Sequence, residues 1–298
     1  MFGLHAVKRD QPLTWSAPFI FLIALALSLL VCAALLAVQG KPPFTGLFIL
    51  WDGSFAHLYT LEDALLKSVP LFLCSLGVAV CFRMQIWNIG AEGQFALGAV
   101  GATAMALAFP ELPWYGVLPL MFLGAAIFGA LWALIPAYLK LKLRMNEIIT
   151  TLMLNYIGIL LLDYMVYGPW KDPVSFGFPM TPMFSEAAII ADIGATRMHW
   201  GMVLCVAVGA VMWVFLQRTR LGYELKASGE GRRTAHYAHM PYGFLVLLVM
   251  GLCGMLAGWA GAMEASHSLN RLQPSIMAGY GYTAIIVGNA LAGLAGAA

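Results

Sequence analysis

Three polar side chains stand close together between two apolar segments: Asn88, Glu92 and Gln94, with Gly90 and Gly93 among them. Placing a carboxylate at membrane depth costs about 2.5–3.5 kcal/mol on insertion scales, so such a group usually lines a polar pocket or path. The glycines favour a local break in a helix. Two interpretations stay open: a helix break beside a translocation pathway, or wet structural residues at the cytoplasmic rim.

A second polar set follows at helical spacing. Glu147, Thr151 and Asn155 are four residues apart, and a spacing of four drifts only about 40° per step around an α-helix. We therefore predict that they share one stripe, which faces the interior of a bundle rather than lipid. Interhelical hydrogen bonding and lining of a pathway would both account for this stripe.

The stretch 217–240 is the most polar loop between apolar segments, and it holds five of the sixteen lysines and arginines. We expect two short helices in it. The first would cover 223–228, bracketed by Gly222 and the pair Gly229 and Gly231. The second would cover 232–239, with Ala235 and Ala238 on one side.

The elements that must position these residues are apolar. The chain has 298 residues, of which 61% are hydrophobic and 10% charged, against about 25% charged in a typical soluble domain. A membrane span needs about 20 apolar residues, and candidate spans are 17–38, 68–82, 94–109, 112–139, 148–168, 198–216, 241–263 and 275–298. Spans 68–82 and 94–109 are short and flank Asn88, as discontinuous helices at transport sites do. The predicted fold is an all-α, polytopic transmembrane helix bundle of about eight segments, one domain over 1–298.

The distribution of positive charge predicts the orientation. If each span crosses once, eleven of the sixteen lysines and arginines fall on the side of the N-terminus, including Lys8 and Arg9. Because cytoplasmic loops are enriched in these residues, the N-terminus is predicted to be cytoplasmic. The run 17–38 is longer than the roughly 7–15 residues of a signal-peptide core, which favours a retained anchor helix.

Glycines and cysteines inside the spans have structural explanations. Gly254 and Gly258 form a G-x-x-x-G pair, which predicts close packing of helix backbones. The five cysteines all lie in apolar stretches and none has C-x-x-C spacing, so we expect buried, small apolar side chains rather than metal ligands or disulfides.

Several functional classes are disfavoured by the motifs. There is no G-x-x-x-x-G-K-[ST] loop for a nucleotide phosphate and no H-E-x-x-H motif. His236 and His239 have no further ligand near them in sequence, although a structural metal site needs three or four. A net charge of +2 is too small to indicate a nucleic-acid partner. We expect no cofactor, no metal and no catalytic residue, and hence a protein that is not an enzyme.

Three stretches together resemble a known family. The run N-I-G-A-E-G-Q at 88–94, followed by Gly98 and Ala99, resembles a signature of ABC-importer permeases of the simple-sugar, nucleoside and branched-chain amino acid group. The run R-M-N-E-I-I-T-T-L-M-L-N-Y at 144–156 is similar to that group's N-E-[VI]-I-x-T-[IL]-M-L-N-Y segment. The run R-T-R-L-G-Y-E-L-K-A-S-G-E at 218–230 resembles the loop such permeases present to their ATPase. The resemblance is nearest to nucleoside-type permeases that work with basic-membrane-protein-like binding proteins.

The resemblance implies a function and a set of partners. It implies a permease subunit that translocates nucleosides or related simple sugars across the bacterial inner membrane. Its partners would be an ATP-binding-cassette ATPase subunit, a second permease subunit of the same or another chain, an extracytoplasmic substrate-binding protein and the lipid bilayer. The translocation pathway would involve Asn88, Glu92, Gln94, Glu147, Thr151 and Asn155. Contact with the ATPase would involve Gly222, Glu224, Ala227, Gly229, Arg232, Arg233 and Ala235.

The chain departs from the family pattern in two places. After Gly-Glu the family continues with Asn-Pro and ends the loop with Gly-Ile, where this chain has Gly231-Arg232 and His239-Met240. Family members also run about two helices past a segment like G-Y-G-Y-T-A-I at 279–285, so C-terminal helices are expected to be missing here. The alternatives are a permease for branched-chain amino acids or another small polar solute, and an ATP-independent carrier with Glu92 as its coupling carboxylate.

Overall fold

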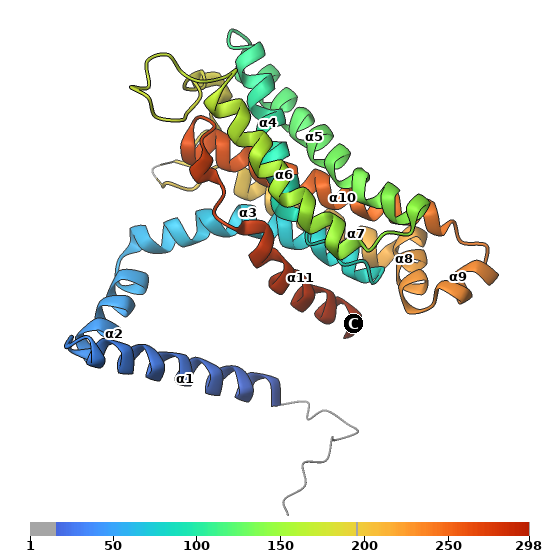
Figure 1. The fold of residues 1–298 in the computed structure, drawn as a ribbon, viewed down its shortest axis with the longest axis horizontal. Coiled ribbons are helices and arrows are strands. Elements are labelled where there is room, and N and C mark those ends of the chain that lie inside the picture. The colour runs from blue at the N-terminus through green and yellow to red at the C-terminus, as the bar shows by residue number, and fades with distance from the viewer. Residues whose placement is uncertain (1–15, 195, 298) are drawn as a thin grey trace, which may run out of the picture. The chain divides into compact units, whose positions relative to one another are not determined.

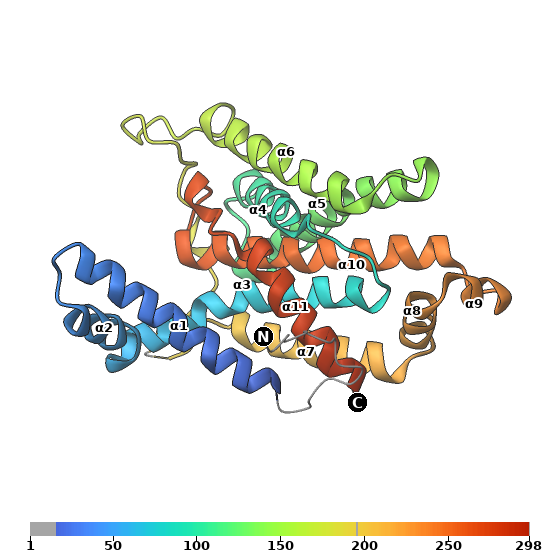
Figure 2. The ribbon, with the colours of Figure 1, turned by 60° about the horizontal axis from the view of Figure 1, so that its bottom comes forward.

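The computed structural model describes residues 16–194 and 196–297 (Figures 1 and 2). Within these residues the secondary structure is helical, apart from one isolated bridge between Asp192 and His199. The chain divides into two compact units, Met1–Asp63 and Ala64–Ala298, and each is described by itself.

The first unit contains α1 (Ser16–Val38), α2 (Pro43–Trp51) and a π-helical turn, η1 (Asp52–Ala56). α1 is apolar throughout and packs on α2, while most of its side chains are exposed, as suits a helix surrounded by lipid. Lys8 and Arg9, which contribute to the predicted cytoplasmic N-terminus, lie outside the described residues.

The second unit takes up most of α3 (Leu58–Arg83) and all the later elements. The long helices are α4 (Ala91–Ala108), α5 (Trp114–Leu143), α6 (Glu147–Tyr167), α7 (Gly201–Arg218), α10 (Tyr242–Met263) and α11 (Tyr280–Ala297). Two shorter helices, α8 (Arg220–Glu230) and α9 (Arg232–Tyr237), connect α7 to α10. Short turns complete the unit: η2 (Glu186–Ala188), η3 (Glu264–Leu269) and η4 (Pro274–Ile276).

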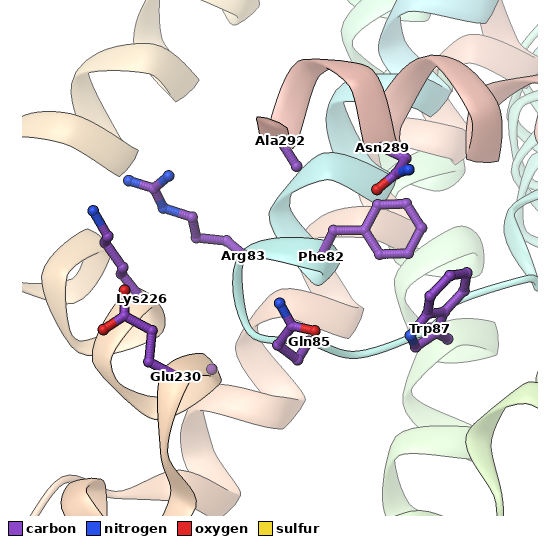
Figure 3. Close-up of a pocket in the computed structure, with 9 residues that line it drawn as sticks. Phe82, Arg83, Gln85, Trp87, Lys226, Glu230, Asn289 and Ala292 are labelled. Carbon is purple, nitrogen blue, oxygen red and sulfur yellow. The ribbon is translucent and has the colours of Figure 1, made fainter. Parts of the chain in front are cut away.

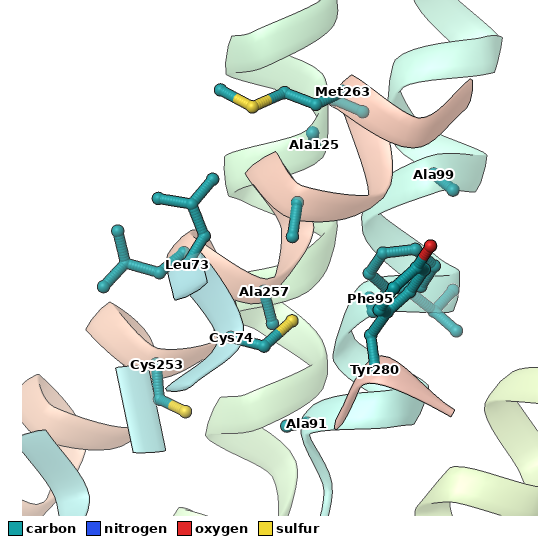
Figure 4. Close-up of a cluster of buried hydrophobic side chains, with 14 of the residues drawn as sticks. Leu73, Cys74, Ala91, Phe95, Ala99, Ala125, Cys253, Ala257, Met263 and Tyr280 are labelled. Carbon is teal, nitrogen blue, oxygen red and sulfur yellow. The ribbon is translucent and has the colours of Figure 1, made fainter. Parts of the chain in front are cut away.

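The core of this unit forms around α4. Residues 91–103 of α4 are all buried, and the helix packs against α5, α6, α10 and α11 (Figure 1). Small side chains permit this close packing, with Ala91, Ala99, Ala125 and Ala257 among the larger Phe95 and Met263 (Figure 4). A helix buried on every side has no need of an apolar stripe, because each of its faces meets protein.

The G-x-x-x-G prediction is confirmed. A Cβ added to Gly254 would meet the Gly129 carbonyl oxygen of α5, and one added to Gly258 would meet the Ala125 carbonyl oxygen. Gly98 of α4 lies directly against Gly258. The three helices therefore cross at points where only hydrogen atoms separate their backbones.

The predicted all-α bundle is confirmed, with differences in the spans. Seven helices among the described residues are long and apolar enough to cross a membrane; α4, one of the eight predicted segments, is the exception. The prediction that 68–82 is short was wrong, because α3 begins at Leu58. Lys67 and Pro70 interrupt the apolar pattern there, yet the helix continues through both. All five cysteines are free thiols, and four of them are buried.

Candidate functional site: a clamped helix break

The predicted break separates α3 from α4. The chain leaves α3 at Arg83, passes Gln85 in the left-handed region with φ 56°, and enters α4 after Gly90. Asn88 and Gln94 close the loop with two reciprocal hydrogen bonds between their amides, at 3.1 and 3.2 Å. The Asn88 Oδ1 atom also accepts the Gly90 N–H at 2.9 Å. Both side chains are buried and satisfied by each other, which favours a fixed break.

The break lies deep along the bundle. The Asn88 Nδ2 atom lies 3.1 Å from the Cys253 Sγ atom. Cys253 is eleven residues after Tyr242, the first residue of α10. At 1.5 Å per residue this is about 16 Å, or half the length of that helix. The polar cluster therefore sits at the middle of α10 rather than at its end.

Glu92 makes a long-range contact with the start of α11. Its Oε1 atom accepts a hydrogen bond from the Gly279 N–H at 3.0 Å, and its Oε2 atom accepts one from the Gly281 N–H at 2.6 Å. The carboxylate is 2% exposed. Backbone N–H groups at a helix N-terminus have no intrahelical partners and carry partial positive charge. A buried anion is therefore well placed there, and it ties α4 to α11.

Glycine is needed at both of these α11 positions for different reasons. Gly279 has φ +81°, which other residues rarely adopt. Gly281 approaches α4 so closely that an added Cβ would overlap the Glu92 backbone nitrogen. The run G-Y-G-Y-T-A-I resembles a family segment, but nothing local in the sequence connects Gly279 or Gly281 to Glu92.

The predicted stripe on α6 clamps the break from the other side. The Thr151 Oγ1 atom accepts the Ile89 N–H at 3.2 Å, and the Asn155 Oδ1 atom accepts the Gly93 N–H at 2.8 Å. The Asn155 Nδ2 atom donates to the Ile89 carbonyl at 2.6 Å. Thr151 and Asn155 are fully buried, so interhelical hydrogen bonding accounts for both.

Glu147 is separate from this cluster. It is the first residue of α6, and its Oε1 atom lies 2.7 Å from the Lys140 Nζ atom near the end of α5. The preceding residue, Asn146, caps α6 by accepting the Ile148 N–H. Glu147 therefore shares the stripe by spacing but lies at the helix end, about 12 Å along the axis from Asn155.

The two helices expected in 217–240 are present as α8 and α9, with one correction. Gly222 and Gly229 do not bracket the first helix but lie inside it. Thr219 begins α8 by accepting the Gly222 N–H at 3.2 Å. A Cβ on Gly222 would meet carbonyl oxygens at the end of α7, and one on Gly229 would meet the Arg83 carbonyl oxygen. The glycines thus allow α8 to pack closely on α7 and on the break.

Among the residues expected to contact the ATPase, the five whose side chains are described are not on the exposed face of α8 and α9. Gly222, Glu224 and Ala235 are buried within this chain, and Ala227 and Gly229 are half-buried. The exposed positions include Tyr223 and Lys226, together with Tyr237 of α9. The side chains of Arg232 and Arg233 lie outside the described residues.

A cleft of about 390 Å³ opens where the break meets α8 and α11 (Figure 3). It is lined by Phe82, Arg83, Gln85, Trp87, Lys226, Gly229, Glu230, Asn289 and Ala292. Its walls come from the end of α3 and the break that follows it, from α8 and from α11.

The geometry defines a class of protein: a multi-pass membrane protein in which a clamped polar break separates α3 from the central helix α4, with the short helix α8 packed against the start of that break. Residues 60–298 match the family described as branched-chain amino acid transport system / permease component, and the chain belongs to this family. Such a permease component is a transport subunit rather than an enzyme, within an ABC transport system whose ATPase is a separate subunit.

Three relatives illustrate the family. The chain is 32% identical to the glucose ABC transporter permease protein TsgB13 of Haloferax volcanii, over 93% of this chain and 75% of that protein. It is 32% identical to the guanosine ABC transporter permease protein NupP of Bacillus subtilis, over 82% and 70%. It is 27% identical to the nucleoside ABC transporter permease protein NupB of Lactococcus lactis subsp. cremoris, over 81% and 69%. No solved structure matches the chain.

Proposed function

We propose that this chain is the permease subunit of an ABC importer that translocates nucleosides or related simple sugars across the bacterial inner membrane. The observation that carries the proposal is the polar break at mid-depth, held by α6 and α11 and touched by α8. Relatives named for guanosine, nucleosides and glucose support this solute class. These solutes share neutral rings with several hydroxyl groups.

The pathway residues take two roles in this proposal. Asn88, Gln94, Thr151 and Asn155 hold the break open as a fixed polar frame, and Glu92 holds α11 against it. Glu147, at the end of α6, acts at the inner mouth. An ion-coupled carrier would need Glu92 to exchange its partners with ions. Since both Glu92 oxygens bind backbone N–H groups, the geometry favours an energy source outside this chain.

In this proposal α8 and α9 dock in a groove of the ATPase, a helix-in-groove contact. Their exposed side chains, Tyr223 and Lys226 among them, make the contact, while the buried face transmits it to the break. A second permease subunit completes the pathway, and a substrate-binding protein delivers solute at the outer surface.

The test is reconstitution. The chain is purified from native membranes with its associated subunits and placed in liposomes. Uptake of guanosine, glucose and leucine is measured with and without ATP and binding protein. We expect an ATPase to co-purify and to drive uptake of guanosine or glucose. A preparation without any ATPase that still transports would contradict the proposal, and uptake of leucine alone would favour the branched-chain amino acid alternative.

A further inference from the structure

Tyr282 occupies a position fixed by the Glu92 contact. It follows Gly281, whose N–H is held by the Glu92 carboxylate. Tyr282 is 36% exposed, and its side chain lies near that of Asn155. Tyr156, which follows Asn155 in α6, lies near Tyr282 and is 56% exposed. Tyr156 of α6 and Tyr282 of α11 are thus two exposed aromatic residues near each other and beside the break.

The depth of this surface argues against contact with lipid tails. Asn155 lies eight residues into α6, about 12 Å along its axis, and the hydrocarbon core is about 30 Å thick. Two phenols and the exposed Thr283 hydroxyl gather at this level. Polar groups within the hydrocarbon region usually face a bundle interior or a water-filled path. The polar groups of this surface therefore suit the lining of a water-filled translocation pathway.

We propose that Tyr282 and Tyr156 form a solute-contact site for a neutral, ring-shaped polar solute, a nucleoside in the first instance. This proposal rests on the transport function proposed above. Aromatic faces stack on a nucleobase or on the apolar face of a sugar. The two phenols and the Thr283 hydroxyl supply hydrogen bonds to solute hydroxyl groups. Glu92 acts as a positioning residue, because it holds the start of α11 and so places Tyr282.

The first experiment asks whether Tyr282 faces water. Tyr282→Cys is made in a Cys32→Ser background, since the other four cysteines are buried. In the reconstituted complex we expect labelling by a small charged methanethiosulfonate, slowed when guanosine and binding protein are present. Leu131→Cys, on the exposed face of α5, is the matched control and should react only with a lipophilic maleimide. If Tyr282→Cys behaves like Leu131→Cys, the inference is overturned.

The second experiment asks whether the ring acts on solute. Tyr282→Leu should lower guanosine transported per ATP hydrolysed about fivefold, the factor that corresponds to a stacking contribution near 1 kcal/mol. Tyr282→Phe keeps the ring and should retain most of the activity. Tyr138→Leu, an exposed tyrosine of α5, should leave the ratio unchanged. A merely structural role would lower the amount of folded complex without changing this ratio.

The outcomes separate the two proposals. If the wild-type complex shows no ATP-driven uptake of nucleosides or sugars, the transport function itself fails. If the wild type transports and Tyr282→Leu keeps the wild-type ratio of solute to ATP, only the contact site is refuted.

Discussion

The Glu92 Oε2 atom accepts the Gly281 N–H at 2.6 Å, although the two residues are 189 positions apart in the chain. The contact joins the first turn of α4 to the start of α11 at the point where the backbones nearly touch. Charge-assisted hydrogen bonds of this length are strong when buried. The Glu92 carboxylate therefore ties the start of α11 to the helix that follows the break.

Replacing Glu92 with Gln should weaken this contact. An amide offers one acceptor oxygen, so one of the Gly279 and Gly281 N–H groups would face an NH2 group and lose its bond. Leaving a buried donor unsatisfied costs about 1–3 kcal/mol. We expect a lower unfolding temperature for Glu92→Gln in nanodiscs and a lower temperature still for Glu92→Ala. Glu111→Gln changes an exposed glutamate and should match the wild type; equal stability of all four proteins would contradict the assignment.

Two glycines of α10 give a matched pair for the helix crossings. Gly258→Ala would place a methyl group against the Ala125 carbonyl and close to Gly98, whereas a Cβ at Gly251 meets only a Leu134 methyl at 3.8 Å. Overpacking typically costs about 1–3 kcal/mol, while Gly→Ala in an open helical site is neutral or stabilising. The unfolding temperature should therefore fall for Gly258→Ala and not for Gly251→Ala. Equal effects at both positions would mean that the crossings are looser than described.

The two faces of α8 and α9 predict different defects. Ala235 is fully buried, so Ala235→Asp should destabilise this chain and lower its yield in the membrane. Tyr237 is 85% exposed, so Tyr237→Asp should leave the yield unchanged and reduce co-purification of the ATPase. Yield is measured by fluorescence-detected gel filtration and association by pull-down. Normal ATPase recovery with Tyr237→Asp would remove this residue from the docking surface.

Composition and local pattern were enough to predict the bundle, the break after α3, the α6 stripe and the two helices of 217–240. These features depend on periodicity, glycine spacing and the energetic cost of polar groups in lipid, which are local properties. The start of α3 was missed because Lys67 and Pro70 interrupt its apolar pattern, although the helix continues through both residues.

The partners of the polar residues could not be predicted in the same way. Spacing placed Thr151 and Asn155 on one face, but nothing in the sequence indicated that they bind the backbone of the break. The sequence also provided no indication that Glu92 binds the Gly281 N–H. The position of Tyr282, the next residue, follows from that contact. Contacts between segments this far apart depend on how the helices cross, and glycines lie at these crossings, Gly158 against Gly93 and Gly281 against Glu92.

His199 gives the last prediction, on pH dependence. It precedes α7, is 3% exposed, and its ring centroid lies 4.1 Å from that of His267 in η3. Its Nδ1 atom accepts the Gly201 N–H at 3.0 Å, which requires the neutral ring. Burial, and secondarily the neighbouring His267, lowers the pKa of His199 from 6.5 to about 4, while Asp192 opposes the shift.

Because the folded protein binds this proton less readily than the unfolded chain, the stabilising contribution is complete above pH 6.5 and is lost as the pH falls toward 4. The loss within that window is about 1.4 kcal/mol per pH unit, or about 2 kcal/mol at pH 5. His199→Asn keeps an acceptor for the Gly201 N–H and removes the titration. The unfolding temperature in nanodiscs, measured from pH 7.5 down to pH 5, should therefore fall more steeply for the wild type than for His199→Asn. Parallel profiles would show that His199 titrates normally, because the region around it and His267 opens to water.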